Sequence, residues 1–112
     1  MGTEQPLNAE QDNKVLIIDD NLTNRVLMDE LLRANGYETR HAKDGKEGVK
    51  AVEEWRPNLI LLDLIMPQMD GKEVCKRVRA MDLKPRPSII IVSVKDDKET
   101  IVDLLANGAD DF

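Results

Sequence analysis

The sequence predicts an α/β domain in three layers, with helices on both faces of a parallel sheet. Short apolar runs rich in β-branched residues alternate with segments whose apolar residues recur at helical spacing, in the order βαβαβαβα. Several runs are apolar without interruption, which is typical of strands buried on both faces, as in parallel sheets. The alternation therefore predicts right-handed crossovers and a doubly wound sheet.

The first predicted strand covers residues 15–18 and ends at the acidic pair Asp19-Asp20. Apolar side chains then recur at steps of four and five residues, which predicts an amphipathic helix. These side chains are Leu22, Val26, Leu27, Leu31 and Leu32. Asn35-Gly36 is a C-cap signal, and it predicts the end of this helix.

The second βα unit is predicted over residues 37–57. Residues 37–42 form the strand, Asp44-Gly45 turns the chain, and Pro57 ends the helix. The apolar face of that helix carries Val49, Val52 and Trp55. We expect Trp55 to be a core anchor at the end of the helix.

The third strand is predicted over residues 59–62 and is followed directly by Asp63. A loop containing Pro67 and Asp70-Gly71 leads into the third helix, which Pro85 and Pro87 separate from the next strand. The apolar face of this helix carries Val74, Val78 and Met81, and we expect the neighbouring Cys75 to serve packing.

The fourth strand is predicted over residues 89–93 and ends at Ser93. Asp96-Asp97 can cap a last helix, which Asn107-Gly108 ends. The apolar residues of this helix are Ile101, Leu104 and Leu105.

Polar side chains stand at the ends of three predicted strands. They are Asp19 and Asp20 after the first, Asp63 after the third and Ser93 after the fourth. Ligands of doubly wound sheets bind at the carboxyl ends of the strands, so we expect these side chains to meet. Gathered carboxylates repel one another, and a hard divalent cation such as Mg²⁺ or Mn²⁺ relieves that repulsion. The pattern predicts a Mg²⁺-assisted phosphoryl site, in which one carboxylate could act as the nucleophile.

Composition excludes several other classes of protein. The net charge of −6 and 3% aromatic content argue against direct nucleic-acid binding. One histidine and one cysteine cannot build a multi-histidine or thiolate-cluster metal site. No apolar run is long enough to span a membrane, and residues 1–13, read as a flexible leader, contain no apolar signal core. We therefore expect a cytoplasmic protein with no membrane contact.

Three motifs together resemble the receiver domain of bacterial two-component response regulators. They are Asp19-Asp20, the stretch from Asp63 to Gly71 (DLIMPQMDG), and Ser93. The final stretch NGADDF (residues 107–112) resembles the family's approach to its fifth strand, and the likeness covers residues 14–112. It implies a flavodoxin-like receiver fold with strand order 2-1-3-4-5.

The resemblance also implies a role for each residue. Asp63 would accept a phosphoryl group from the phosphohistidine of a sensor histidine kinase or phosphotransfer protein. Asp20 would bind Mg²⁺ directly and Asp19 mainly through water, with Asp63 and the backbone carbonyl of Ile65 as further ligands. Ser93 would hydrogen-bond the aspartyl phosphate. Such a domain is not an enzyme acting on a separate substrate; it assists its own phosphorylation and dephosphorylation.

Phe112 falls where the family has its switch aromatic, and the phosphoryl group would switch an output partner or a domain outside these residues. The family's fifth-strand lysine and most of the fifth βα unit have no counterpart in the 112 residues. We therefore expect an exposed flank on the first helix and unpaired amides along residues 88–94. Those exposures would favour a non-standard homodimer through the fourth-strand edge.

Other functions remain as alternatives. The missing lysine leaves open a docking or dimerisation module that cannot be phosphorylated. A haloacid-dehalogenase-type phosphatase needs Asp-x-Asp after its first strand, which Asp19-Asp20-Asn21 does not provide. A flavodoxin-type binding module needs a hydroxyl-rich loop there, and Thr23 is the only hydroxyl in residues 21–24. Neither GxGxxG nor GxxxxGK[ST] occurs, which argues against nucleotide binding.

Overall fold

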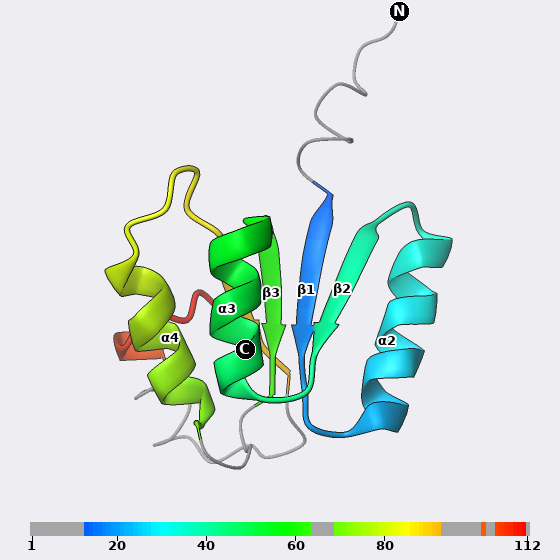
Figure 1. The fold of residues 1–112 in the computed structure, drawn as a ribbon, viewed down its shortest axis with the longest axis horizontal. Helices are drawn as coiled ribbons and strands as arrows, with labels where there is room; N and C mark the ends of the chain where they lie inside the picture. Colours follow the sequence, from blue (N-terminus) through cyan, green and yellow to red (C-terminus); the bar gives the residue numbers. More distant parts are fainter. Residues whose placement is uncertain (1–12, 64–68, 93–101, 103–104, 112) are drawn as a thin grey trace, which may run out of the picture.

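A computed structural model describes residues 13–63, 69–92, 102 and 105–111. Four parallel strands form one sheet in the order β2-β1-β3-β4. The strands are β1 (Lys14–Ile18), β2 (Glu38–Ala42), β3 (Leu59–Leu62) and β4 (Ser88–Ile91). This order confirms the predicted doubly wound arrangement as far as the described residues reach, and Figure 1 shows the central strands side by side.

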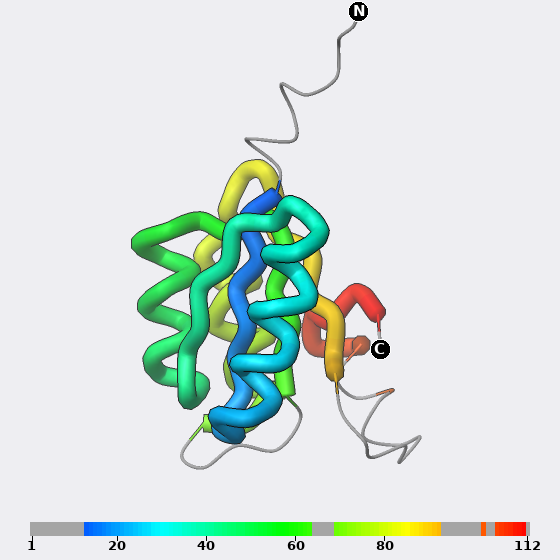
Figure 2. The backbone as a smooth tube through the Cα atoms, turned by 90° about the vertical axis from the view of Figure 1, so that its right-hand side faces the viewer, coloured from blue at the N-terminus to red at the C-terminus, as the bar shows by residue number. Residues whose placement is uncertain are grey.

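Three helices connect the strands and cover both faces of the sheet. They are α2 (Leu22–Ala34), α3 (Gly45–Trp55) and α4 (Gly71–Ala80). Each follows an N-cap residue whose side-chain oxygen accepts a backbone N–H of the first turn, and two of these residues lie in the turns predicted at Asp44 and Asp70. These caps are Asn21, Asp44 and Asp70. Figures 1 and 2 show α2 and α3 on opposite sides of the strands, which completes the three layers.

The main core lies between the sheet and the pair α3–α4. Alternate strand residues, including Leu16, Ile60 and Ile89, are fully buried there against Val52 and Val78. Cys75 and Trp55 belong to the same cluster, as expected. Burial raises the pKa of the Cys75 thiol to about 11, so this side chain serves packing.

The half-buried face of α2 is not the apolar face that the sequence predicted. Its half-buried side chains are Arg25, Met28, Asp29 and Leu32, at helical spacing. Four of the five apolar residues that predicted the helix are instead more than 40% exposed: Leu22, Val26, Leu27 and Leu31. This agrees with the expected exposed flank on the first helix.

Polar contacts join α2 to β2. Asp29 accepts a hydrogen bond from Thr39 of β2 and lies 3.3 Å from Nε2 of His41 on the same strand. The Thr39 hydrogen bond is the main reason that the pKa of Asp29 is lowered. These contacts tie the half-buried face of α2 to β2.

Where the structure describes the edge of β4, its amides at Ile89 and Ile91 are paired, contrary to the unpaired amides that the sequence predicted for residues 88–94. The N–H of Ile91 donates to the carbonyl of Asp111 over 3.0 Å, and the carbonyl of Ile89 accepts the N–H of Asp110 over 2.8 Å. The N–H of Ile89 donates to the Asp110 carboxylate over 2.8 Å. Residues 110–111 therefore already satisfy this edge, and the premise for a homodimer through it was wrong at these positions.

The residues that satisfy the β4 edge lie where the resemblance expected the approach to a fifth strand. Asp111 forms a parallel bridge with Ile90, which places it next to β4 in the strand order. Val102, Leu105 and Ala106 are helical, in agreement with the predicted last helix. Its proposed caps, Asp96 and Asp97, lie outside the described residues.

Two boundaries differ slightly from the prediction. The second strand begins at Glu38 rather than Tyr37, because the Tyr37 N–H closes the C-terminus of α2 by donating to Leu32. Asn13, read as the last leader residue, donates from Nδ2 to the Gly36 carbonyl over 2.9 Å. In the described part of the chain, no helix has the length and apolar character needed to cross a membrane.

Candidate phosphoacceptor site

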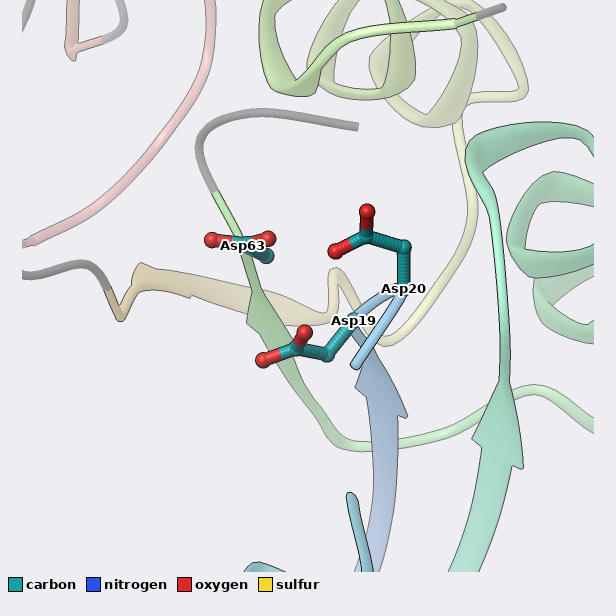
Figure 3. Close-up of side chains that lie close together, drawn as sticks. All are labelled: Asp19, Asp20 and Asp63. Atoms are coloured by element: carbon teal, nitrogen blue, oxygen red, sulfur yellow. The ribbon is translucent and has the colours of Figure 1, made fainter. Parts of the chain in front are cut away.

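Three carboxylates meet at the carboxyl ends of β1 and β3. One oxygen each from Asp19, Asp20 and Asp63 lies within 4.8 Å of the others. Asp19 and Asp20 follow β1 and Asp63 follows β3, and these two strands are hydrogen-bonded neighbours. Figure 3 shows the three side chains around one space. The structure thus brings together the three acids that the sequence predicted.

Strand register places these residues beside one another. The N–H of Asp63 donates to the carbonyl of Ile18 over 2.8 Å, which continues the β1–β3 pairing by one residue. The N–H of Asp19 likewise donates to the carbonyl of Ala42 on β2 over 3.1 Å. The backbone of both acids is therefore fixed by the sheet, while their side chains lie beyond its hydrogen-bonded core.

The two adjacent aspartates have different surroundings. Asp19 is only 4% exposed, whereas Asp20 is exposed and Asp63 is partly buried. Asp19 Oδ1 accepts the N–H of Asn21 over 2.9 Å, and its Oδ2 lies 3.4 Å from Nδ2 of Asn24. Both oxygens of Asp19 already meet donors, which suits the expected indirect contact to a cation through water.

The donor set fits a hard divalent cation. Carboxylate oxygens are preferred ligands of Mg²⁺ and Mn²⁺, and Mg²⁺ usually retains several waters besides one or two carboxylates. At about 4.8 Å, each pair of unit charges repels by roughly 1 kcal/mol even in water, so neutralisation by a cation is favourable. Asp19, Asp20 and Asp63 would hold the ion.

Three expected site residues fall outside the described part of the chain. They are Ile65, with its backbone carbonyl as a predicted ligand, Ser93, and Phe112 as the switch aromatic. Their roles stay predictions. Val92, one residue before Ser93, donates its N–H to the carbonyl of Leu62 over 2.9 Å. This bond continues the β3–β4 pairing up to the residue that precedes Ser93.

Sequence reasoning missed the residues that support Asp19. Asn24 contacts its carboxylate, and Nη1 of Arg25 donates to its backbone carbonyl over 2.7 Å. Neither residue was assigned a role at the site from the sequence. The available signal was their spacing, because residues five and six positions beyond Asp19 lie on the first turn of the following helix.

Trp55 lies at the opposite end of β1 from the acids. Lys14, the first residue of β1, places Nζ 5.4 Å from the centroid of the Trp55 ring, and the Arg40 guanidinium lies 4.9 Å from it. Lys14 Nζ also donates to the Trp55 carbonyl over 3.1 Å. The indole is therefore remote from the cation site and is not a direct reporter of binding there.

A second charged cluster joins the C-terminal residues to α4 and β4. The Asp110 carboxylate accepts from Arg79 over 2.8 Å and from Arg86 over 2.6 Å. Burial raises the pKa of Asp110, but the Arg86 hydrogen bond, the Ile89 N–H and both guanidinium charges outweigh burial, and the pKa is lowered. Desolvation is the main reason that the pKa of Arg79 is lowered. This cluster joins Asp110 to α4 and β4 and is separate from the acidic site.

Comparisons with known proteins agree with this geometry. The family model described as the response regulator receiver domain matches residues 15–112. The fold and the acidic site define a doubly wound α/β domain with three acids at its strand ends. The chain belongs to the response regulator receiver domain family.

Characterised relatives are transcriptional regulators. The chain is 37% identical over 98 residues to the transcriptional regulatory protein AfsQ1 of Streptomyces coelicolor, covering 88% of this chain and 42% of that protein. It is 37% identical over 99 residues to the alkaline phosphatase synthesis transcriptional regulatory protein PhoP of Bacillus subtilis, covering 88% and 40%. The chain thus spans about two fifths of the length of these relatives.

Solved structures show the same fold. The chemotaxis protein CheY4 of Vibrio cholerae superposes with a TM-score of 0.83 at 31% identity, covering 88% of this chain and 82% of that one. A CheY-like receiver domain protein from Methanospirillum hungatei gives a TM-score of 0.79 at 31% identity, covering 88% and 78%. Both support the flavodoxin-like receiver fold.

Proposed function

We propose that this chain is a phosphoacceptor switch of two-component signalling in which Asp63 receives the phosphoryl group. One observation carries the proposal: oxygens of Asp19, Asp20 and Asp63 lie within 4.8 Å of one another at adjoining strand ends. Family membership supports the same reading. An acid cluster of this kind favours the phosphoacceptor over a module that serves only docking or dimerisation.

The proposed transfer uses the side chains in distinct roles. A carboxylate oxygen of Asp63 attacks phosphorus, an O–P bond forms, and the P–N bond to the histidine of the partner kinase or phosphotransfer protein breaks. The imidazole leaves with the electron pair of that bond and takes up a proton. A bound Mg²⁺ or Mn²⁺ would neutralise charge on the phosphoryl oxygens. Asp19 and Asp20 would hold the ion beside Asp63, and hydrolysis would later restore the carboxylate.

The output is part of the proposal. The relatives named above are transcriptional regulators, and a phosphoryl group adds charge that biases a two-state surface. We propose that the switched element is a partner or an output domain outside these 112 residues, which would carry any contact with DNA. The proposed location is the cytoplasm, with no contact to membranes by this domain.

Intact mass after incubation with acetyl phosphate and Mg²⁺ tests the acceptor. We expect the parent chain to gain one phosphoryl group and Asp63→Asn to gain none. Asp70→Asn is the matched control, because Asp70 is an exposed acid that caps α4 and asparagine is also a good cap. This variant should be phosphorylated like the parent.

Three results would contradict the proposed acceptor. The first is the absence of an adduct on a parent chain that circular dichroism shows to be folded. The second is an adduct that persists in Asp63→Asn. The third is an adduct lost equally in Asp63→Asn and Asp70→Asn.

A further inference from the structure

A side-chain amide on the first turn of α2 contacts the buried acid Asp19. Nδ2 of Asn24 lies 3.4 Å from Asp19 Oδ2, while the Asn21 N–H donates to Oδ1 over 2.9 Å. The two oxygens of the most buried acid at the site therefore face donors from the segment that begins α2. Asn24 itself is exposed, so its side chain contributes little to the core.

This contact replaces the usual arrangement at a helix start. In a capping box, the side chain at the third helical position accepts the N–H of the N-cap residue. Here the N-cap is Asn21, and its N–H is directed to Asp19 instead. Asn24 occupies the third helical position and donates to the same carboxylate, while its own N–H is capped by Asn21 Oδ1 over 3.0 Å. The helix cap and the acid thus form one hydrogen-bond network.

The backbone of Asp19 is held from two other directions. Nη1 of Arg25 donates to its carbonyl over 2.7 Å, and its own N–H donates to the carbonyl of Ala42 over 3.1 Å. With the backbone fixed, rotation about the side-chain bonds is the main freedom left to the carboxylate. Asn24 and the Asn21 N–H oppose that rotation, because each contacts a different oxygen.

We propose that Asn24 is a positioning residue for the divalent-cation site. It holds the Asp19 carboxylate in the orientation that brings an oxygen close to those of Asp20 and Asp63, without binding the cation itself. The inference rests on the proposed function and adds to it a residue outside the ligand set. Residues that orient metal ligands typically change affinity about 10–100-fold when they are removed. Because the 3.4 Å contact is long, we expect an effect near the lower limit, about tenfold.

Calorimetric titration of the 112-residue chain with Mg²⁺ tests the proposal. Asn24→Ala should bind Mg²⁺ about tenfold more weakly than the parent. Asn35→Ala is the matched control, because Asn35, the C-cap of α2, is also an exposed amide and donates from Nδ2 to the Leu31 carbonyl over 2.7 Å. It lies at the other end of the helix and should leave the affinity unchanged.

A further variant and a second readout separate positioning from a general loss of structure. Asn24→Gln retains the amide donor and should recover most of the affinity lost in Asn24→Ala. Urea unfolding without metal should show the same stability for Asn24→Ala and Asn35→Ala. If Asn24→Ala weakens Mg²⁺ binding only in proportion to a lower metal-free stability, the positioning role is refuted.

Asp20→Asn distinguishes failure of this inference from failure of the proposed function. If the parent binds Mg²⁺ and Asp20→Asn does not, the cation site stands. Equal affinities for the parent and Asn24→Ala would then overturn the positioning role alone. If the parent does not bind Mg²⁺, or Asp20→Asn binds it equally well, the proposed cation site fails and the role of Asn24 fails with it.

Discussion

Removing one charge from the acidic cluster should stabilise the metal-free protein. We consider Asp20→Asn, which preserves the size of the side chain and removes one of three carboxylates. Asp20 is exposed, so the substitution leaves no cavity. The variant should be more stable than the parent in EDTA and should gain less from Mg²⁺.

The magnitude follows from the geometry of the cluster. At the 4.8 Å limit that contains one oxygen of each acid, two unit charges in a water-like medium repel by about 0.9 kcal/mol. Asp20 takes part in two such pairs, but repulsion with its chain neighbour Asp19 persists in the unfolded state. Repulsion with Asp63 exists only in the folded state. We therefore expect a gain of about 1 kcal/mol, which should raise the Tm by roughly 4–8 °C.

Differential scanning calorimetry in EDTA at neutral pH and about 0.1 M salt measures the effect. The carboxylate oxygens are much closer than the screening length of about 10 Å at that salt concentration, so their repulsion still affects stability. The control is Glu54→Gln, which removes the same charge from an exposed position on α3 and should change stability by less than about 0.5 kcal/mol. At ten times Kd, Mg²⁺ should stabilise the parent by about 1.4 kcal/mol and Asp20→Asn by less.

The electrostatic reasoning would be refuted by a metal-free Asp20→Asn that is no more stable than the parent. It would also be refuted if Glu54→Gln raised the Tm as much, because the gain would then reflect net charge. Equal stabilisation of parent and variant by Mg²⁺ would remove Asp20 from the ligand set.

Two further predictions concern stability away from the acidic site. Asp110→Asn should cost about 2 kcal/mol at pH 7, because it leaves the largely buried Arg79 without its carboxylate partner. The pKa of Asp110 is lower in the folded protein than in the unfolded chain, where it lies near 4. The stability that the ionised carboxylate contributes is therefore complete above the unfolded-state pKa and is lost as the pH falls through the folded-state pKa. Urea unfolding at pH 7 and pH 3 should therefore show a smaller cost at pH 3, and an equal cost would contradict the charge argument. Ile60→Ala should lower the free energy of unfolding by about 2–5 kcal/mol, because it leaves a cavity under α3 and α4. Leu31→Ala, at a position that is 66% exposed, should lower it little. Similar losses of stability for the two variants in urea unfolding would refute the assignment of Ile60 to the core.

Local patterns predicted most elements of the fold because each carries its own signal. Uninterrupted apolar runs predicted β1, β3 and β4 within one or two residues, since buried parallel strands need apolar residues on both faces. Asn21, Asp44 and Asp70 begin their helices because their side chains cap backbone N–H groups only a few residues away. Such signals need no knowledge of distant contacts.

The state of the β4 edge could not be predicted locally. Its backbone groups are satisfied by Asp110 and Asp111, about twenty residues further along the chain. The contact between α2 and β2 is a similar case, because Asp29 pairs with Thr39 and His41 on a different element. In both cases, the polar contact joins residues of different elements, which a local pattern cannot indicate.

The sequence by itself determined the chemistry of the candidate site. Acids that follow the first and third strands must meet in a parallel sheet of this order, because hydrogen-bonded parallel strands end at a common edge. Only the tertiary structure decided how differently the acids are held. Asp19 is buried beneath Asn24 and the start of α2, while Asp20 is exposed, because the chain turns between them as it leaves the sheet. Orientation at this scale depends on contacts across elements, which residue type and spacing along the chain do not encode.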